Sequence, residues 1–124
     1  VGLVLINLGD ALVGHGELQA AWDAYQRALA ITEVATGPEH PMVAYALVGL
    51  AEVALARLDA AAALPYAERA TAIRERGEVM PGELAQARFL VARALARGGA
   101  SAAPAGVLPG LEQRREALAV ERRR

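Results

Sequence analysis

One pattern of residues occurs twice in this 124-residue sequence, with the copies 42 positions apart, and this repetition limits the folds that the chain can adopt. The first copy runs over residues 7–33, and a weaker one begins at Gly49. The matched positions include Leu8 with Leu50, Asp10 with Glu52, Glu17 with Asp59, Ala21 with Ala63, and Ile31 with Ile73. A fixed period of this length is typical of structural repeats that stack on one another.

Each copy has the pattern of two helices joined by a short turn. Apolar residues recur at helical spacing over residues 2–14, at Leu5, Leu8, Leu12 and Val13. The glycines on either side of His15 predict a turn, and a second helix is predicted over residues 17–35. Its inward residues would be Leu18, Ala21, Trp22, Tyr25, Ala28, Leu29 and Ile31. Because the connection is short, the two helices should lie antiparallel.

The same reading continues along the chain. Pro41 should open a third helix over residues 41–57 after a loop at 36–40, since proline suits a first helical turn. Asp59 is a plausible N-cap for a fourth helix, which reaches residue 76 and should bend locally at Pro65. Pro81 should open a fifth helix, with its core over 83–97. Residues 98–109 predict a loop, and 111–123 predict a helix that is either a degenerate repeat or a terminal cap.

We therefore expect one helical domain over residues 1–124, with repeats at about 1–40, 41–80 and 81–124, the last of them degenerate. The first residue is Val and lies inside a predicted helix, so we expect the chain to be a piece of a longer protein. Small residues at Gly9, Ala21 and Ala28 are expected where the paired helices approach most closely, which makes them packing residues.

The pair Leu8-Gly9, followed by Ala21, Tyr25 and Ala28 in the second helix, resembles the tetratricopeptide repeat. The second copy departs from that pattern at Ala67 and Leu58, which replace Tyr25 and Gly16. The usual period of that family is about 34 residues. The longer period here is similar to the variety found in kinesin light chains and in many bacterial signalling proteins. The resemblance implies an all-α solenoid of antiparallel helix pairs, a TPR-like superhelix with about two and a half to three repeats.

The composition excludes several classes of protein. The chain has no Cys, so disulfides and thiolate metal sites are excluded. A formal net charge of −1 gives no reason to expect nucleic acid or an anionic membrane as a partner. No apolar run approaches the roughly 18 residues that span a bilayer, and we expect a cytoplasmic location. All 13 basic residues are Arg, which suggests a GC-rich bacterial gene.

The sequence offers little for catalysis, and we expect no enzyme activity, cofactor or metal. Ser101 is the only Ser, and no HExxH, P-loop or GxGxxG motif is present. Glu39-His40 fits either a metal site or, more commonly, a loop cap. Asp10 and Glu52 occupy equivalent places and fit either an acid/base pair or, as we favour, a solvated acidic stripe.

The C-terminal tail is rich in arginine, at Arg114, Arg115 and residues 122–124. One reading is a patch for nucleic acid or an acidic partner. Glu112, Glu116 and Glu121 alternate with these arginines at helical spacing, which favours a solvated face paired with itself.

The resemblance also implies where a partner binds, because the family uses the concave wall built from first helices. Transferred position by position, that wall consists of Leu3, Ile6, Asn7, Asp10, Tyr45, Val48, Glu52, Gln86, Phe89, Arg93 and Arg97. This mixture suits a protein or peptide partner with apolar anchors. Two alternatives stay open: a regulatory region of a larger bacterial signalling enzyme such as a Ser/Thr protein kinase, and a purely structural or self-association element. The oligomeric state is left open.

Overall fold

The computed structural model describes residues 1–78 and 80–98 of the chain, and this part consists of five α-helices without strands. The helices are α1 (Gly2–Gly14), α2 (Leu18–Thr36), α3 (Pro41–Ala56), α4 (Ala60–Arg76) and α5 (Pro81–Ala96). The predicted all-α fold is confirmed, and the predicted bounds agree with the observed ones within two residues. The predicted last helix, the loop before it, Ser101 and the arginine-rich tail lie outside the described residues.

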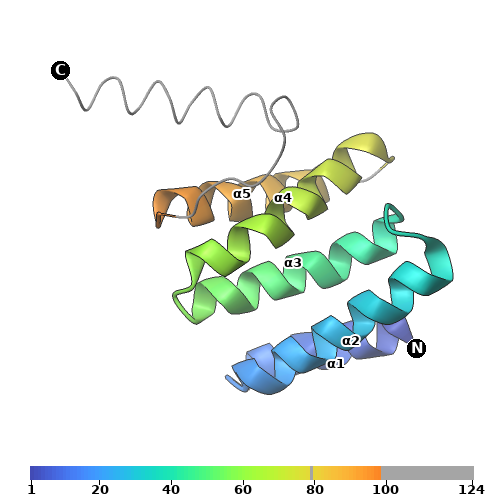
Figure 1. Cartoon of the computed structure of the whole chain (residues 1–124), viewed down its shortest axis with the longest axis horizontal. Coiled ribbons are helices and arrows are strands. Elements are labelled where there is room, and N and C mark those ends of the chain that lie inside the picture. Colours follow the sequence, from blue (N-terminus) through green and yellow to red (C-terminus); the bar gives the residue numbers. More distant parts are fainter. Residues whose placement is uncertain (79, 99–124) are drawn as a thin grey trace.

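Each helix packs against the next one along the chain, and the helices stack in pairs (Figure 1). The first helices of successive pairs also touch one another, α1 with α3 and α3 with α5. Hence α1, α3 and α5 form one layer of the molecule, while α2 and α4 form the second layer. This is the arrangement of an α-α solenoid, in which the repeat is a pair of antiparallel helices.

The helix starts follow from local chemistry. Pro41 and Pro81 stand in the first turn of α3 and α5, where their missing N–H is not needed. The Nδ1 atom of His40 accepts a hydrogen bond from Met42 N at 3.1 Å, so His40 caps α3, as the capping interpretation of the Glu39-His40 loop expected. Asp59 Oδ1 accepts from Ala62 N at 3.1 Å and caps α4, as predicted. Helix α4 continues through Pro65 to Arg76.

The core of the first pair is organised around Tyr25, which is completely buried between two glycines of neighbouring first helices. A Cβ atom on Gly9 of α1 would lie 2.5 Å from Tyr25 Cε1, and a Cβ atom on Gly49 of α3 would lie closer still. The close approach predicted at Gly9 is therefore confirmed. Gly49, which the repeat pattern alone did not mark as a packing residue, leaves space for the same ring atoms from α3.

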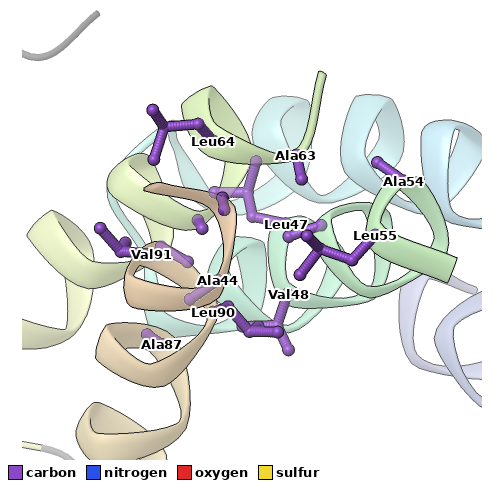
Figure 2. Packing of buried hydrophobic residues seen from close by; sticks show 14 of the residues in the cluster. Ala44, Leu47, Val48, Ala54, Leu55, Ala63, Leu64, Ala87, Leu90 and Val91 are labelled. Atoms are coloured by element: carbon purple, nitrogen blue, oxygen red, sulfur yellow. The ribbon is translucent and has the colours of Figure 1, made fainter. Parts of the chain in front are cut away.

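The larger core lies between α3, α4 and α5, whose side chains gather in one cluster (Figure 2). The counterpart of Tyr25 in the second pair is Ala67, which is fully buried in this cluster together with Leu90 and Val91 of α5. Thus a large second-helix residue faces small first-helix residues in one repeat, and a small one faces large residues in the next. The exchange of sizes keeps both interfaces filled.

The orientation of α1 differs from the predicted one at Leu8. Its side chain is 48 % exposed, although it was expected to face inward. The buried face of α1 instead passes through Gly2, Ile6 and Gly9, while Leu5 is half-buried beside it. The reason is geometric: α2 and α3 both lie on the side of α1 that carries Gly2, Ile6 and Gly9, and no described helix covers the flank that carries Leu8.

Candidate partner-binding face

The candidate site lies on the layer formed by the first helices, because α1, α3 and α5 are neighbours there. Helical periodicity brings Leu3, Asn7 and Asp10 to one side of α1, and Tyr45 and Glu52, two turns apart, to one side of α3. On α5 the same spacing aligns Gln86, Phe89, Arg93 and Arg97. We call the surface made by these nine residues the first-helix face.

The structure separates the predicted site residues by exposure. Leu3, Tyr45 and Phe89 are 53 %, 40 % and 61 % exposed, and Asn7, Asp10, Gln86 and Arg97 are also exposed. Glu52 and Arg93 are half-buried. The remaining two, Ile6 and Val48, are nearly completely buried in the two core clusters, so a partner would reach very little of either side chain. These two residues hold the helices together beneath the face.

At the α1 end, the face is anchored to the second layer through Asp10. The hydroxyl of Tyr25 donates a hydrogen bond to Asp10 Oδ1, so the ring that fills the core also positions this carboxylate. Burial, together with that hydrogen bond, raises the pKa of Tyr25, which keeps its hydroxyl a donor at all ordinary pH values.

In the centre of the face, Glu52 of α3 is linked to α5. Gln86 Nε2 donates to Glu52 Oε1 at 3.3 Å. Burial and the nearby Asp10 carboxylate raise the pKa of Glu52, whereas the hydrogen bond from Gln86 acts in the opposite direction. The two carboxylates that the repeat pattern paired are therefore close enough to repel one another. They form an acidic pair on the first-helix face.

Beneath the α3–α5 end lies Arg74, a residue of α4 that sequence analysis did not select for the site. It is only 2 % exposed. Its Nη1 atom donates to the Glu83 carbonyl oxygen at 2.5 Å and to Gln86 Oε1 at 3.3 Å. Its guanidinium carbon lies 5.4 Å from the centre of the Tyr45 ring. Burial lowers the pKa of Arg74, and the Glu83 carboxylate counteracts that effect.

Arg74 thus holds α3, α4 and α5 in register under the face. The sequence contains a signal for this role, because Arg74 occupies the place of Thr32 in the first copy, on the side of the second helix that should be buried. Thr32 is buried as well and donates to the Ala28 carbonyl of its own helix. A charged residue in such a place needs partners from neighbouring helices, which only the packed structure identifies.

Two further contacts organise the exposed aromatic residues. The Tyr45 hydroxyl donates to Glu83 Oε1 at 2.5 Å, and this hydrogen bond raises the pKa of Tyr45. The Arg93 guanidinium carbon lies 5.7 Å from the centre of the Phe89 ring, within the range of a cation–π contact. Both rings are therefore held in place while one side of each stays open to solvent, which pre-organises them for a partner.

The remaining chemistry is sparse in the part of the chain that the structure describes. No group of three or more His, Asp or Glu side chains within residues 1–78 and 80–98 is arranged to hold a metal ion. None of the helices α1 to α5 combines the length and the apolar character that crossing a bilayer requires. His40 is used as a helix cap, and His15 is exposed in the turn between α1 and α2.

The fold and the exposed first-helix layer define a class of protein, the helical-repeat solenoids that interact with other proteins. Comparison with known families is specific: the model of the family described as "Tetratricopeptide repeat" matches residues 1–76. The chain belongs to the tetratricopeptide repeat family. No curated protein and no solved structure matches the sequence. Repeats of this family are generally protein–protein interaction modules.

Proposed function

We propose that this chain is a protein-interaction module that holds a peptide or an extended partner segment against the first-helix face. The observation that carries the proposal is the exposure of Leu3, Tyr45 and Phe89, one from each of three neighbouring first helices. Large apolar side chains aligned across successive repeats offer anchor points for an extended ligand. Two of them, Tyr45 and Phe89, are aromatic, the type of residue enriched at interface cores.

Polar groups of the face complement these anchors. The amide of Asn7 offers both a donor and an acceptor to a partner backbone, and Gln86 offers the same chemistry on α5. The charges differ along the face: Asp10 and Glu52 make the α1–α3 part acidic, whereas Arg93 and Arg97 make the α5 part basic. We therefore expect a partner segment with apolar residues at regular intervals, a basic residue toward α1 and an acidic one toward α5.

The test is a screen of displayed peptides against the intact chain, followed by affinity measurements on the selected peptides. A face variant carries Asn7→Ala, Tyr45→Ala and Phe89→Ala. A matched control variant carries Asp23→Ala, Val34→Ala and Ala61→Ser, three exposed positions on second helices. We expect the face variant to lose at least about tenfold in affinity, which is about 1.4 kcal/mol, and the control to retain its affinity. Equal losses in both variants would contradict the proposal.

We also propose that the repeats are of the long variety that resembles kinesin light chains. The observation in favour is the spacing of the helix starts: Pro41 and Pro81 open consecutive first helices 40 positions apart. The usual family period is about 34 residues. A role as the regulatory region of a bacterial signalling enzyme, such as a Ser/Thr kinase, stays a prediction. Sequencing the gene on both sides of this segment tests it, because a kinase domain would have to be encoded beside the repeats.

A further inference from the structure

One flank of the first helix pair exposes apolar side chains that lie away from the first-helix face. Val4 and Leu8 of α1 are 68 % and 48 % exposed, and Ala11, one turn further along, is exposed as well. The spacing of these three residues places them on one side of the helix. With the exposed Arg27 of α2, they make up what we call the first-pair flank.

The equivalent surface of the second repeat, on α3, is buried. The counterparts of Val4, Leu8 and Ala11 in α3 are Ala46, Leu50 and Val53. All three are completely buried, with 0 % of each residue accessible to solvent. They pack in one cluster with Tyr25 and Ala28 of the preceding second helix. The same side of a first helix is therefore buried against a preceding helix pair in α3 and open in α1.

The charged residue of the flank, Arg27, also has a counterpart with partners in the second repeat. The counterpart of Arg27 is Arg69 of α4, whose Nη1 lies 2.7 Å from Glu33 Oε1 of the preceding second helix. Arg69 Nη2 also donates to the Pro38 carbonyl at 3.1 Å. Within residues 1–78 and 80–98, Arg27 makes no such ion pair. Among the described residues, the arginine that binds the previous pair in one repeat therefore has no ionic partner in the other.

The residue at position 7 limits the size of the side chain that another helix can place against the first-pair flank. Asn7 stands where α3 has Gly49, against which the Tyr25 ring lies. A ring in the equivalent place would collide with the Asn7 side chain. Helix α4 shows the alternative, because its residue at that place is Ala67, and it faces α5, where larger side chains stand at Leu90 and Val91.

We propose that the first-pair flank is a stacking surface for one further helix pair of this repeat type. Its second helix would resemble α4, with a small residue in the place of Ala67 and a carboxylate in the place of Glu33 that pairs with Arg27. A second copy of the described chain does not offer such a face, because α3 already covers α2 and α5 already covers α4. This surface shares Asn7 with the first-helix face, whereas Val4, Leu8, Ala11 and Arg27 lie outside that face.

The test places residues 41–83 a second time directly ahead of Val1. Ala67 of the added pair then precedes Asn7 by 23 positions, the same separation as that between Ala67 and Leu90. Because the chain has no Cys, a single Leu8→Cys substitution reports the accessibility of the flank through its rate of thiol labelling. We expect labelling to slow at least about tenfold in the extended chain, because the added pair must first detach from the flank. A tenfold effect corresponds to a free-energy cost of about 1.4 kcal/mol for this detachment. The control is Val34→Cys, at a residue 90 % exposed on α2, whose labelling should be equal in both chains.

Substitutions in the extended chain test the specified chemistry. Ala67→Tyr and Ala51→Gly, made together and only in the added pair, give the ring the space that Gly9 provides for Tyr25 and leave a collision with Asn7. This double substitution should restore fast labelling at position 8, and Asn7→Gly should reverse that effect. Equal labelling of Leu8→Cys in the original and extended chains would overturn the proposal, including the case in which the added pair stays unfolded. Self-association of the original chain that Leu8→Glu abolishes, measured by sedimentation, would also overturn it, because a second copy would then be the occupant.

Discussion

Tyr25 is the residue on which the first repeat depends, because it fills the core and also positions Asp10 on the surface. Gly9 and Gly49 provide the space for its ring from two different helices. The arrangement connects residues that are distant in sequence, so a substitution at any of the three should alter the packing at the other two. Interaction of this kind makes mutational effects non-additive.

Gly49→Ala should destabilise the fold by about 1–3 kcal/mol, because the added methyl group overlaps the buried Tyr25 ring. Helix propensity alone would give the opposite sign, since Ala is favoured over Gly by about 1 kcal/mol in a helix interior. In a Tyr25→Ala background the overlap is absent, and Gly49→Ala should become stabilising. Urea denaturation of the four chains of this double-mutant cycle measures both effects.

The control for this cycle is Gly14→Ala, at a helical glycine whose added Cβ would have no neighbour within 4 Å. Its effect should be small and independent of Tyr25. The packing interpretation would be wrong if Gly49→Ala had the same effect in both backgrounds.

Leu58 carries backbone strain that its counterpart Gly16 avoids. Both residues turn the chain between paired helices with positive φ angles, 60° for Leu58 and 76° for Gly16. The left-handed conformation costs an ordinary residue roughly 1–2 kcal/mol, and Leu58 is 83 % exposed, so few contacts offset that cost. Leu58→Gly should therefore raise the unfolding free energy by about 0.5–1 kcal/mol. Leu58→Ala removes the same exposed side chain but keeps the strain, and a gain of equal size there would contradict the explanation.

At the scale of a helix, the start of α4 depends on Asp59, whose carboxylate accepts from Ala62 N. The helix contains Pro65 and has no acidic residue in its first turn, so few other local features support its beginning. Asp59→Ala should cost about 1 kcal/mol, and Asp59→Asn much less, because an amide oxygen also caps. Thermal unfolding followed by circular dichroism distinguishes the two variants. Equal losses would show that the charge, and not the cap, matters.

Between helices, Glu52 makes the stability of the α1–α3–α5 layer depend on pH. Its pKa is raised in the folded protein, so the folded state binds a proton more tightly than the unfolded chain does. Stability therefore falls as the pH rises from the ordinary pKa of Glu, 4.5, through the raised pKa of Glu52. Glu52→Gln keeps an acceptor for Gln86 and removes the charge, and it should flatten this part of the profile.

The measurement is the urea midpoint at a series of pH values for the original and the Glu52→Gln chain. The two profiles should converge at low pH, where Glu52 is protonated, and separate at neutral pH with the variant more stable. A variant that is less stable at neutral pH would show that attraction to Arg74 and Arg93 outweighs burial and the Asp10 charge.

At the scale of the whole molecule, stability is distributed unevenly over the solenoid. The core between α3, α4 and α5 is the larger one, whereas α1 leaves Val4 and Leu8 open to solvent. Repeat arrays gain stability from contacts between neighbouring repeats, and about three repeats are the usual minimum. We expect the isolated chain to unfold well below ~90 °C, the threshold of hyperstability. A sharp transition above that temperature in calorimetry would contradict this expectation.

Hydrogen exchange should show the same uneven distribution. Amide protons of α3, which packs against both helix pairs, should exchange most slowly, and those of α1 most rapidly among the five helices. Mass spectrometry of peptides from the exchanged chain measures this order directly. The reverse order, with α1 best protected, would mean that the flank of α1 is covered in solution.

The helices, their caps and the repeat could be predicted from the sequence because their causes are local. Apolar spacing, Pro41 and Pro81 at first turns, Asp59 as a cap and the 42-residue repetition each act within a few residues or one period. Only the tertiary structure decided which side of each helix is buried. Leu8 is exposed and Ile6 buried, Gly49 receives the Tyr25 ring, and Arg74 lies beneath the first-helix face, because these outcomes depend on how three helices from different repeats fill a shared space.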